Sequence, residues 1–293
     1  RPDQELAKGT VTMLRADLIP SEARALLLSV ARVVLMARRG AIGDQLAVLL
    51  AAPQALAPRL NPPSHPKRPA VALADQGEGL EFFNGLGGFA RDGREYVVTL
   101  DEGDSTPAPW INVIANAGFG FQVSATGSGF VWAENSRDNQ LTPWSNDAVA
   151  DPSGEAFYIR DEDSGEVFSP TASPLRDAGR YTARHGFGYS RFQHTVAGLA
   201  CDLVQFVPLE DPVKISRLRL TNLGGRARTL SVATYAEPVM GTSRAASAPF
   251  IVTARLGAAL LARNPWNTSF PGRVLFSDLN GAATGWTGDR SEF

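Results

Sequence analysis

The segment RDNQLTPWSND, residues 137 to 147, concentrates side chains that could recognise a carbohydrate. A sugar ring presents apolar C–H faces beside dense hydroxyl groups, so an aromatic plane next to short amides and carboxylates is its physical complement. The competing interpretation is a long solvated turn. The candidate sugar-binding residues of this segment are Arg137, Asp138, Asn139, Gln140, Trp144, Asn146 and Asp147.

Three carboxylates in and beside this segment raise the question of catalysis. Glu134, Asp138 and Asp147 lie close in sequence, and a glycosidase needs a pair of carboxyl groups that flank the scissile bond. Charged residues make up 20% of the chain, however, and exposed carboxylates usually solvate a loop or support a turn. We therefore favour the structural interpretation and predict no catalytic residue in this chain.

A second polar stretch, ARHGFGYSRF at residues 183 to 192, could bind an anion or a hydroxyl group. Its two glycines favour a different interpretation, in which they shape a bend between strands while the aromatic rings pack. We also expect His194 to be a packed or exposed strand residue rather than a base. The polar candidates of this stretch are Arg184, His185, Tyr189 and Arg191.

The glycine-rich segment GLGGF at residues 85 to 89 superficially resembles a nucleotide-binding loop. It lacks the preceding parallel strand, the Lys-Ser/Thr ending and the following helix that such a loop requires, so we reject that interpretation. No G-x-S-x-G motif is present either, which leaves a nucleophile-elbow hydrolase unsupported.

Metal and cofactor sites find no support in the residue types. Cys201 is the single cysteine, and the histidines His65, His185 and His194 contain no i, i+4 pair. We expect no metal and no cofactor. The formal net charge of −2 gives no electrostatic case for nucleic acid or an anionic membrane surface as a partner.

The five tryptophans occur beside Asn, Asp and Gly, as in PWIN, TPWSND and NPWNTS. Each can either fill a core or serve as a platform for a sugar ring. We favour the core for Trp110 and Trp132, whereas both interpretations stay open for Trp144 and Trp266.

The elements that must position these residues change character along the chain. Ser21 followed by EARALLLSVARVVLMARR predicts a helix of about five turns, and Asp44 is a candidate cap for a second helix that Pro53 ends. A further helix is expected near residues 3 to 18. The sequence thus predicts a helical segment over residues 1–52, a proline-rich linker over 53–74 and a β domain over 75–293.

The β domain is predicted from short alternating runs separated by Gly, Asp, Asn and Pro. Examples are REYVVTL, GFGFQVSAT, EAFYIRD, YTARHG and LACDLVQFVP, among roughly a dozen such runs. We therefore expect a mainly β fold, a large antiparallel β-sandwich preceded by a short α-helical segment. With 44% hydrophobic residues, the chain can fill the core of such a domain.

Several long motifs of the β domain resemble those of a known family. FFNGLGGFARDGREYVV, TPAPWINVIANAGFGFQVSATGSGFVWAENSRDNQLTPWSND, GRYTARHGFGYSRFQ, GTSRAASAP and WTGDRSEF are similar to the N-terminal sandwich of glycoside hydrolase family 94. The similarity covers roughly residues 80 to 293. Within the family it is greatest to cyclic β-1,2-glucan synthases, and β-1,2-oligoglucan phosphorylases come next.

The resemblance implies a galactose-mutarotase-like supersandwich that precedes an (α/α)6 barrel. It also implies phosphorolysis of a β-glucoside, with inversion, by a barrel Asp that acts as the acid. We expect neither that acid nor the phosphate site within these 293 residues. In related phosphorylases, loops of the sandwich approach the barrel cleft and help form the dimer interface. The resemblance therefore implies a possible homodimer and makes Arg244, in GTSRAASAP, the expected cation for a β-1,2-linked glucan oligosaccharide.

The resemblance further implies a parent that is attached to the bacterial inner membrane. The most apolar window, residues 25 to 36, is shorter than the roughly 20 residues that span a bilayer, so we expect the fragment itself to be soluble. Together with the single cysteine, which favours a reducing compartment, the resemblance implies that it lies on the cytoplasmic side. We expect a non-catalytic domain that faces the carbohydrate cleft of a β-1,2-glucan-processing enzyme. Two alternatives stay open, namely an independent carbohydrate-binding module and a structural or oligomerisation domain.

Overall fold

The computed structural model describes residues 13–15, 19–31, 34–35, 37, 41–50, 79–145, 147 and 149–288. The chain divides into two compact units, Arg1–Pro69 and Ala70–Phe293. The described part of the first unit contains two helices, α1 (Ser21–Val30) and α2 (Ile42–Leu50).

The expected five-turn helix is wrong in its length, because α1 ends at Val30. The N–H of Ala31 still bonds to the carbonyl of Leu27 at 3.1 Å, but Ala31 itself is extended, with φ −68° and ψ 130°. β-Branched residues such as Val30 and Val34 lose side-chain freedom in a helix, which favours termination in this valine-rich stretch. Asp44 lies inside the first turn of α2 rather than before it.

Two other predictions for the first unit lie mostly or wholly outside the described residues. Of the helix expected near residues 3 to 18, only 13–15 are described without gaps, and they are not helical. The linker predicted over 53–74 falls among residues that the structure does not describe. The boundaries 1–52, 53–74 and 75–293 therefore stay predictions.

The second unit consists of antiparallel strands, which confirms the prediction of a mainly β fold. Two short helices, α3 (Arg244–Ser247) and η3 (Ala248–Phe250), accompany the strands. The strands are β1 (Gly87–Ala90), β2 (Glu95–Leu100), β3 (Ile111–Ala115), β4 (Phe119–Ser124), β5 (Gly129–Ala133), β6 (Glu155–Asp161), β7 (Val167–Phe168), β8 (Tyr181–Gly186), β9 (Tyr189–Val196), β10 (Leu199–Phe206), β11 (Ile215–Asn222), β12 (Leu230–Ala236), β13 (Val252–Leu256), β14 (Ala259–Arg263) and β15 (Val274–Ser277).

One layer of the sandwich is a six-stranded sheet in the order β1-β2-β8-β9-β10-β11. Burial alternates strictly along β10, as it must where one face of a strand meets the core and the other does not. Two three-stranded sheets, β3-β4-β5 and β12-β6-β7, pack on that buried face. Phe121 and Leu203 meet in the larger core cluster, while Ile159 and Leu199 meet in the smaller one.

Trp110 and Trp132, for which the core was favoured, are both half-buried. Trp110 packs against the larger core cluster and contacts the ring of Tyr96 edge-on, with 5.9 Å between the ring centroids. Trp132 contacts Phe130 at 5.2 Å. Both rings therefore take part in packing at the margin of the core.

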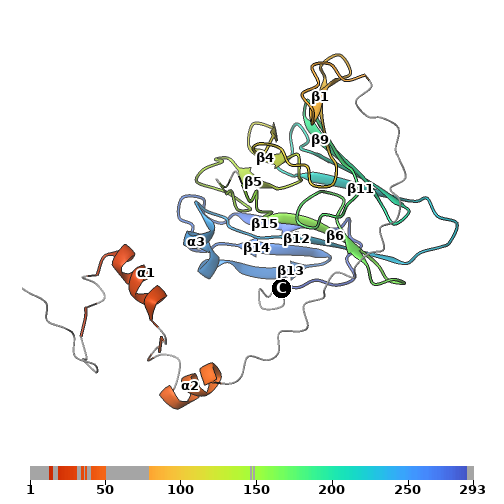
Figure 1. Cartoon of the computed structure of the whole chain (residues 1–293). Coiled ribbons are helices and arrows are strands. Elements are labelled where there is room, and N and C mark those ends of the chain that lie inside the picture. Colours follow the sequence, from red (N-terminus) through yellow and green to blue (C-terminus); the bar gives the residue numbers. More distant parts are fainter. Residues whose placement is uncertain are drawn as a thin grey trace, which may run out of the picture. The chain divides into compact units, whose positions relative to one another are not determined.

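The fourth sheet, β13-β14-β15, completes the described part of the second unit. It lies beside β12, and a cavity separates the two. Figure 1 shows the loop that leaves β5 on the same side of the sandwich as helix α3. Segments more than a hundred residues apart in sequence are thereby brought to one end of the domain.

His194 is a buried polar residue of β9. Its ring stacks on Tyr181 with 3.7 Å between centroids, Nε2 lies 2.8 Å from a carboxylate oxygen of Asp177, and Nδ1 lies 2.9 Å from the carbonyl oxygen of Arg180. These contacts leave no free nitrogen, and His194 is a packed strand residue, as predicted.

Candidate functional site

The β5–β6 loop, residues 134–154, contains the predicted sugar-binding segment. Its first turn is closed by Asn135, whose Oδ1 accepts hydrogen bonds from the backbone N–H groups of Arg137 and Asp138, each at 2.9 Å. The turn points both side chains outward: that of Arg137 is 92% exposed and that of Asp138 is 51% exposed. The two charged groups lie 3.9 Å apart and are available to a ligand.

Asn139 and Gln140 lie inside the protein, and their side chains hold the loop in place. Asn139 Nδ2 donates to the carbonyl of Ala133 at 2.9 Å. Gln140 Nε2 donates to the carbonyl of Thr242 at 3.1 Å, and its Oε1 accepts from the backbone N–H of Trp144 at 3.2 Å. Both residues therefore position the loop rather than present a polar group on its surface.

Trp144 occupies an intermediate position between core and solvent. Its ring contacts Phe130 with 6.3 Å between centroids and a 50° tilt between the planes. The residue is nevertheless 49% exposed. Pro143, just before it, is buried and packs closely on Gly154. One part of the indole is thus fixed by the protein while the rest is open to a ligand.

The end of the loop is fixed by two aspartates. Asp147 Oδ1 accepts from the backbone N–H groups of Ala150 and Val149, and these two hydrogen bonds lower the pKa of its carboxyl group. Asp151 accepts from Ser124 Oγ at 2.6 Å and from Thr126 Oγ1 at 2.7 Å, which ties the loop to the β4–β5 turn. Asn146 lies outside the described residues.

Arg244, the predicted cation, opens helix α3 and is paired. Its Nε and one terminal nitrogen each lie 2.6 Å from an oxygen of Glu237, which is the bidentate arrangement that suits a guanidinium and a carboxylate. The Arg244 side chain is still 56% exposed. It is available to a ligand only as part of this neutral pair.

Three loops meet at residues 240–242, and we call them the loop cluster. They are the β5–β6 loop, the β12–β13 loop (residues 237–251) and the β14–β15 loop (residues 264–273). The backbone of Gln140 exchanges two hydrogen bonds with Gly241, at 3.0 and 3.1 Å. Asn264 and Asn267 both donate from Nδ2 to the carbonyl of Met240, at 3.1 and 2.9 Å. Arg273 pairs with Glu134.

The backbone at Met240 is strained, because this non-glycine residue has φ +48°. The left-handed region is unfavourable for a side chain of this size, and surrounding contacts must hold it there. Here the carbonyl of Met240 accepts from the side-chain amides of Asn264 and Asn267, both on the β14–β15 loop. Sequence reasoning missed this bracing, although the two asparagines flank Trp266 in the segment NPWNTS.

The three carboxylates considered for catalysis have structural partners. Glu134 pairs with Arg273, Asp138 lies beside Arg137, and Asp147 supports a turn. Ionised carboxylates fill such roles, whereas glycoside cleavage requires one protonated carboxyl group at the scissile bond. The arrangement does not form an acid–base pair. Among the described residues, no three His, Cys, Asp or Glu side chains come together as a metal site.

The stretch ARHGFGYSRF forms the β8–β9 hairpin turn, as favoured, with Gly188 at φ +80°. Its two arginines are already paired: Arg184 lies 3.5 Å from Glu95, and Arg191 forms a bidentate pair with Asp202. Burial lowers the pKa of His185 to about 4. The stretch thus offers no free cation for an anionic ligand among the described residues.

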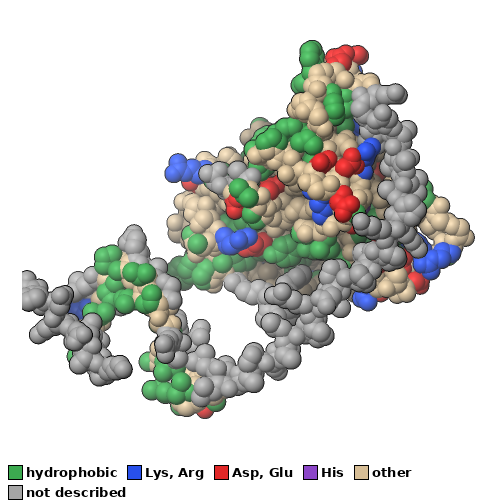
Figure 2. Space-filling view, viewed as in Figure 1, with side chains coloured by type: hydrophobic (Ala, Val, Ile, Leu, Met, Phe, Trp, Pro, Cys, Tyr) green, Lys and Arg blue, Asp and Glu red, His purple; other side chains and the backbone are tan. Residues whose placement is uncertain are grey.

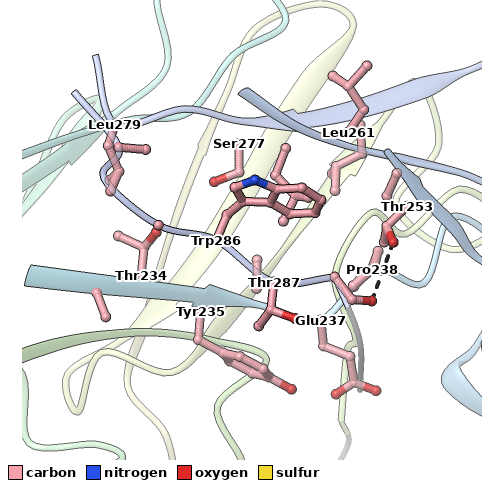
Figure 3. Close-up of a pocket in the computed structure, with 18 of the residues that line it drawn as sticks. Thr234, Tyr235, Glu237, Pro238, Thr253, Leu261, Ser277, Leu279, Trp286 and Thr287 are labelled. Atoms are coloured by element: carbon pink, nitrogen blue, oxygen red, sulfur yellow. Dashed lines mark hydrogen bonds between the residues drawn. The ribbon is translucent and has the colours of Figure 1, made fainter. Parts of the chain in front are cut away.

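A cavity of about 720 Å³ lies between β12 and the β13–β15 sheet. Figure 3 shows Trp286 within it, while Thr253 Oγ1 donates to the carbonyl of Gly288 at 3.3 Å. A polyol needs many donors and acceptors, but most of this lining is aliphatic. We therefore do not assign a sugar to the cavity. Its aliphatic lining includes Val232, Leu260, Leu261, Leu275 and Leu279.

The side chains on the visible face of the second unit carry mixed charges. Figure 2 shows basic and acidic side chains interspersed there with hydrophobic ones, without a large area of one sign. Such a face suits an uncharged ligand better than a polyanion. None of the described helices is both long enough and apolar enough to cross a bilayer.

Bracing by Gln140 leads to a first prediction. Gln140→Ala removes the side-chain bonds to Thr242 and Trp144, and we expect it to lower the free energy of unfolding by about 1 to 2 kcal/mol. Arg137→Ala is the matched control, because its exposed side chain lies three residues away, and it should change stability by less than about 0.5 kcal/mol. Thermal or urea unfolding checks both values. Equal stability of the two variants would contradict the bracing role.

Comparison with known proteins adds to this geometry. Residues 94–293 match the family described as glycosyl hydrolase 94, supersandwich domain. Over 290 residues, or 96% of the chain, the sequence is 41% identical to a cyclic beta-(1,2)-glucan synthase, NdvB, of Rhizobium meliloti (strain 1021). That alignment covers 10% of the synthase.

Two phosphorylases are similar over half of the chain. The sequence is 31% identical over 154 residues to an N,N'-diacetylchitobiose phosphorylase of Vibrio proteolyticus. It is 33% identical over 156 residues to a solabiose phosphorylase of Paenibacillus borealis. Each match covers 52% of this chain, with 19% of the first phosphorylase and 20% of the second. The chain thus spans a fifth or less of the length of these relatives.

Proposed function

Because the chain belongs to glycosyl hydrolase family 94 through its supersandwich domain, we propose that it is a non-catalytic domain of a β-1,2-glucan-processing enzyme. In this role the loop cluster faces the carbohydrate, and the chemical step takes place elsewhere in the enzyme. The ligand is a β-glucan oligosaccharide with β-1,2 linkages. The name of the glucan synthase relative supports that linkage, and the names of the phosphorylases support a carbohydrate more generally.

The observation that carries the proposal is the half-exposed ring of Trp144 on a loop that is braced at both ends. Gln140 fixes the loop before the ring, and Asp151 fixes it after the ring. A rigid aromatic plane binds a sugar face with little loss of conformational entropy. Charged groups of Arg137 and Asp138, a few positions away, are exposed for the sugar hydroxyls.

The proposal assigns different roles to the predicted site residues. Exposed groups contact the sugar directly, whereas buried side chains hold those groups in place. The direct contacts are Arg137, Asp138, Trp144, Asp147 and Arg244, the last as part of its pair with Glu237. Asn139 and Gln140 are the positioning residues. Asn146, which lies outside the described residues, stays a predicted contact.

We further propose that the catalytic acid and the phosphate site belong to an (α/α)6 barrel of a longer parent chain. The share of each relative that this chain covers, 10% and about a fifth, leaves ample length for such a domain. The parent is attached to the bacterial inner membrane with this domain on the cytoplasmic side. A second copy of the chain is a further partner.

One observation favours the alternative of an oligomerisation domain. Phe82, Phe83 and Phe187 are 86%, 50% and 84% exposed, and large apolar side chains in solvent often mark a protein contact. In that role, the protein contact would be made by the turn before β1 and the β8–β9 turn, which carry these side chains, rather than by the loop cluster. An independent carbohydrate-binding module would instead bind sugar tightly without any other domain.

A binding and turnover assay on this chain tests the proposal. We expect β-1,2-linked oligoglucose to bind with a Kd of about 1 mM, because a half-site offers only a few exposed contacts. With inorganic phosphate and the glucan, no glucose 1-phosphate should form. Micromolar binding would favour the independent module, and absence of binding would favour the structural role. Sustained glucose 1-phosphate release that Asp138→Asn or Glu134→Gln abolishes would refute the non-catalytic assignment.

A further inference from the structure

The β14–β15 loop presents a second aromatic side chain, Trp266, on a well-fixed turn. Trp266 is 71% exposed. Its backbone N–H donates to Asn264 Oδ1 at 3.1 Å, and the N–H of Asn267 donates to the carbonyl of Asn264 at 3.2 Å. The N–H of Phe270 donates to Asn267 Oδ1 at 3.0 Å. These bonds hold the backbone on both sides of the ring, so the ring is exposed by the fold itself.

Phe250, from the β12–β13 loop, supports the Trp266 ring. The ring centroids lie 5.3 Å apart, with a 36° tilt between the planes, and Phe250 is itself 38% exposed. Trp266 stays largely in water and Phe250 partly so, and the exposed ring surface forgoes the free energy that burial would provide. A ligand with an apolar face would recover part of it.

The turn that carries Trp266 and the loop that carries Trp144 are braced on neighbouring residues of one segment, 240–242. Asn264 and Asn267 bind the carbonyl of Met240, and Gln140 binds Gly241 and Thr242 while it also holds the backbone of Trp144. The short segment 240–242 therefore anchors both loops, the Trp266 turn at Met240 and the Trp144 loop at Gly241 and Thr242. The fold fixes the two aromatic side chains relative to each other.

We propose that Trp266, supported by Phe250, is a second stacking platform of the same site, so that the loop cluster binds an oligosaccharide rather than a single sugar unit. The inference rests on the proposed function. The pyranose faces of separate glucose units would stack on Trp144 and on Trp266. Thr242, whose carbonyl anchors the Gln140 side chain, is exposed and adds a hydroxyl group beside that anchor.

The cavity that holds Trp286 provides the matched control for this proposal. Trp286 is 47% exposed, close to the value for Trp144, but it belongs to none of the three loops of the cluster. Its cavity is lined mostly by aliphatic side chains and borders the β12–β13 loop, and the guanidinium of Arg255 lies 5.9 Å from its ring centroid. Figure 3 shows Trp286 among Leu261, Ser277 and Leu279. Replacement of Trp286 therefore tests the loss of an indole without the loss of a platform.

The experiment titrates this chain with a β-1,2-linked glucose disaccharide and with a longer β-1,2-linked oligosaccharide, followed by NMR. We expect Trp266→Ala to weaken binding of the longer ligand about five- to tenfold, the size of one exposed stacking contact, and to leave the disaccharide unaffected. Trp266→Phe should retain most of the affinity because it keeps a flat ring. Trp144→Ala should weaken both ligands, and Trp286→Ala should weaken neither.

The outcomes separate this inference from the proposed function. If Trp144→Ala weakens both ligands while Trp266→Ala binds the longer one as the wild type does, the second platform is refuted and the proposed function stands. If the wild-type chain binds neither ligand, both are refuted. A large fall in Tm for Trp266→Ala with unchanged affinity would identify Trp266 as a packing residue and would also overturn the inference.

Discussion

Trp144→Ala, in a longer enzyme that carries this domain, is expected to lower kcat/KM for β-1,2-linked oligoglucose about ten- to a hundredfold. The change removes a half-exposed ring that contacts Phe130 and leaves the loop anchored by Gln140 and Asp151. The backbone N–H that bonds to Gln140 Oε1 is retained in alanine. Stability should therefore change little while the sugar loses its stacking surface.

The structural interpretation of Trp144 makes the opposite prediction. A ring whose role is packing would give a variant with a markedly lower Tm, and the enzyme that stays folded would keep its normal kcat/KM. Trp144→Phe separates the two interpretations further, because it preserves a flat aromatic surface and should restore most of the activity. Measurement of Tm and kcat/KM on the same preparations decides the matter, and a stability loss with normal kinetics refutes the site.

His194→Ala is expected to give the largest loss of stability among the single substitutions considered, about 3 kcal/mol. The change removes a fully buried ring, its stack on Tyr181 and its bonds to Asp177 and to the carbonyl of Arg180. A cavity and unsatisfied acceptors remain. His194 does not belong to the loop cluster, so sugar affinity of the folded fraction should be unchanged. A loss below about 1 kcal/mol would contradict this account of the core.

Low pH should weaken the interaction between His194 and Asp177. Burial raises the pKa of Asp177, but the hydrogen bond and charge of His194 and the backbone N–H of Gly179 outweigh it, and the net pKa is lowered from 3.8. A carboxyl group whose pKa is lower in the folded state than in the unfolded state stabilises the fold at any pH above its unfolded-state pKa. This stabilisation is lost as the pH falls through the folded-state pKa. Unfolding free energies measured from pH 5 downward should therefore decline more steeply for the wild type than for Asp177→Asn. Parallel declines would contradict the assignment.

Strand prediction succeeded where the alternation of side chains carried the signal. The predicted run LACDLVQFVP contains β10 (Leu199–Phe206), and burial alternates strictly along this strand. One face of β10 lies in the core, which gives the period of two expected for a strand. The runs EAFYIRD and YTARHG also coincide with β6 (Glu155–Asp161) and β8 (Tyr181–Gly186), although burial does not alternate strictly along these two.

Three strands were missed, and each has a composition that hides it. β1 (Gly87–Ala90) is glycine-rich, and Gly87 lies so close to the carbonyl of Val97 that a Cβ would be 2.6 Å from it. β14 (Ala259–Arg263) consists of good helix formers, and only its pairing with β13 and β15 decides its conformation. β3 (Ile111–Ala115) is a nearly continuous apolar run without a clear period.

The exposed residues of the candidate site could be predicted from the sequence, but the buried hydrogen bonds and ion pairs that hold them in place could not. Trp144 and the charged residues before it stand out by local composition, because aromatic and polar side chains together suit a sugar. The hydrogen bond from Gln140 to Thr242 joins residues 102 positions apart, and no local sequence pattern predicts such a contact. Arg244 was recognised as a cation, but its partner Glu237 became evident only in the fold.

The measurement that tests the central claim most directly is a heteronuclear NMR titration of the indole N–H signals. The chain has five tryptophans, and each contributes one such signal that substitution can assign. Addition of a long β-1,2-linked oligoglucose should shift the signals of Trp144 and Trp266 and leave those of Trp110 and Trp286 in place. Shifts confined to Trp286, or none at ligand concentrations well above the expected Kd, would contradict the assignment of the loop cluster as the carbohydrate-binding surface.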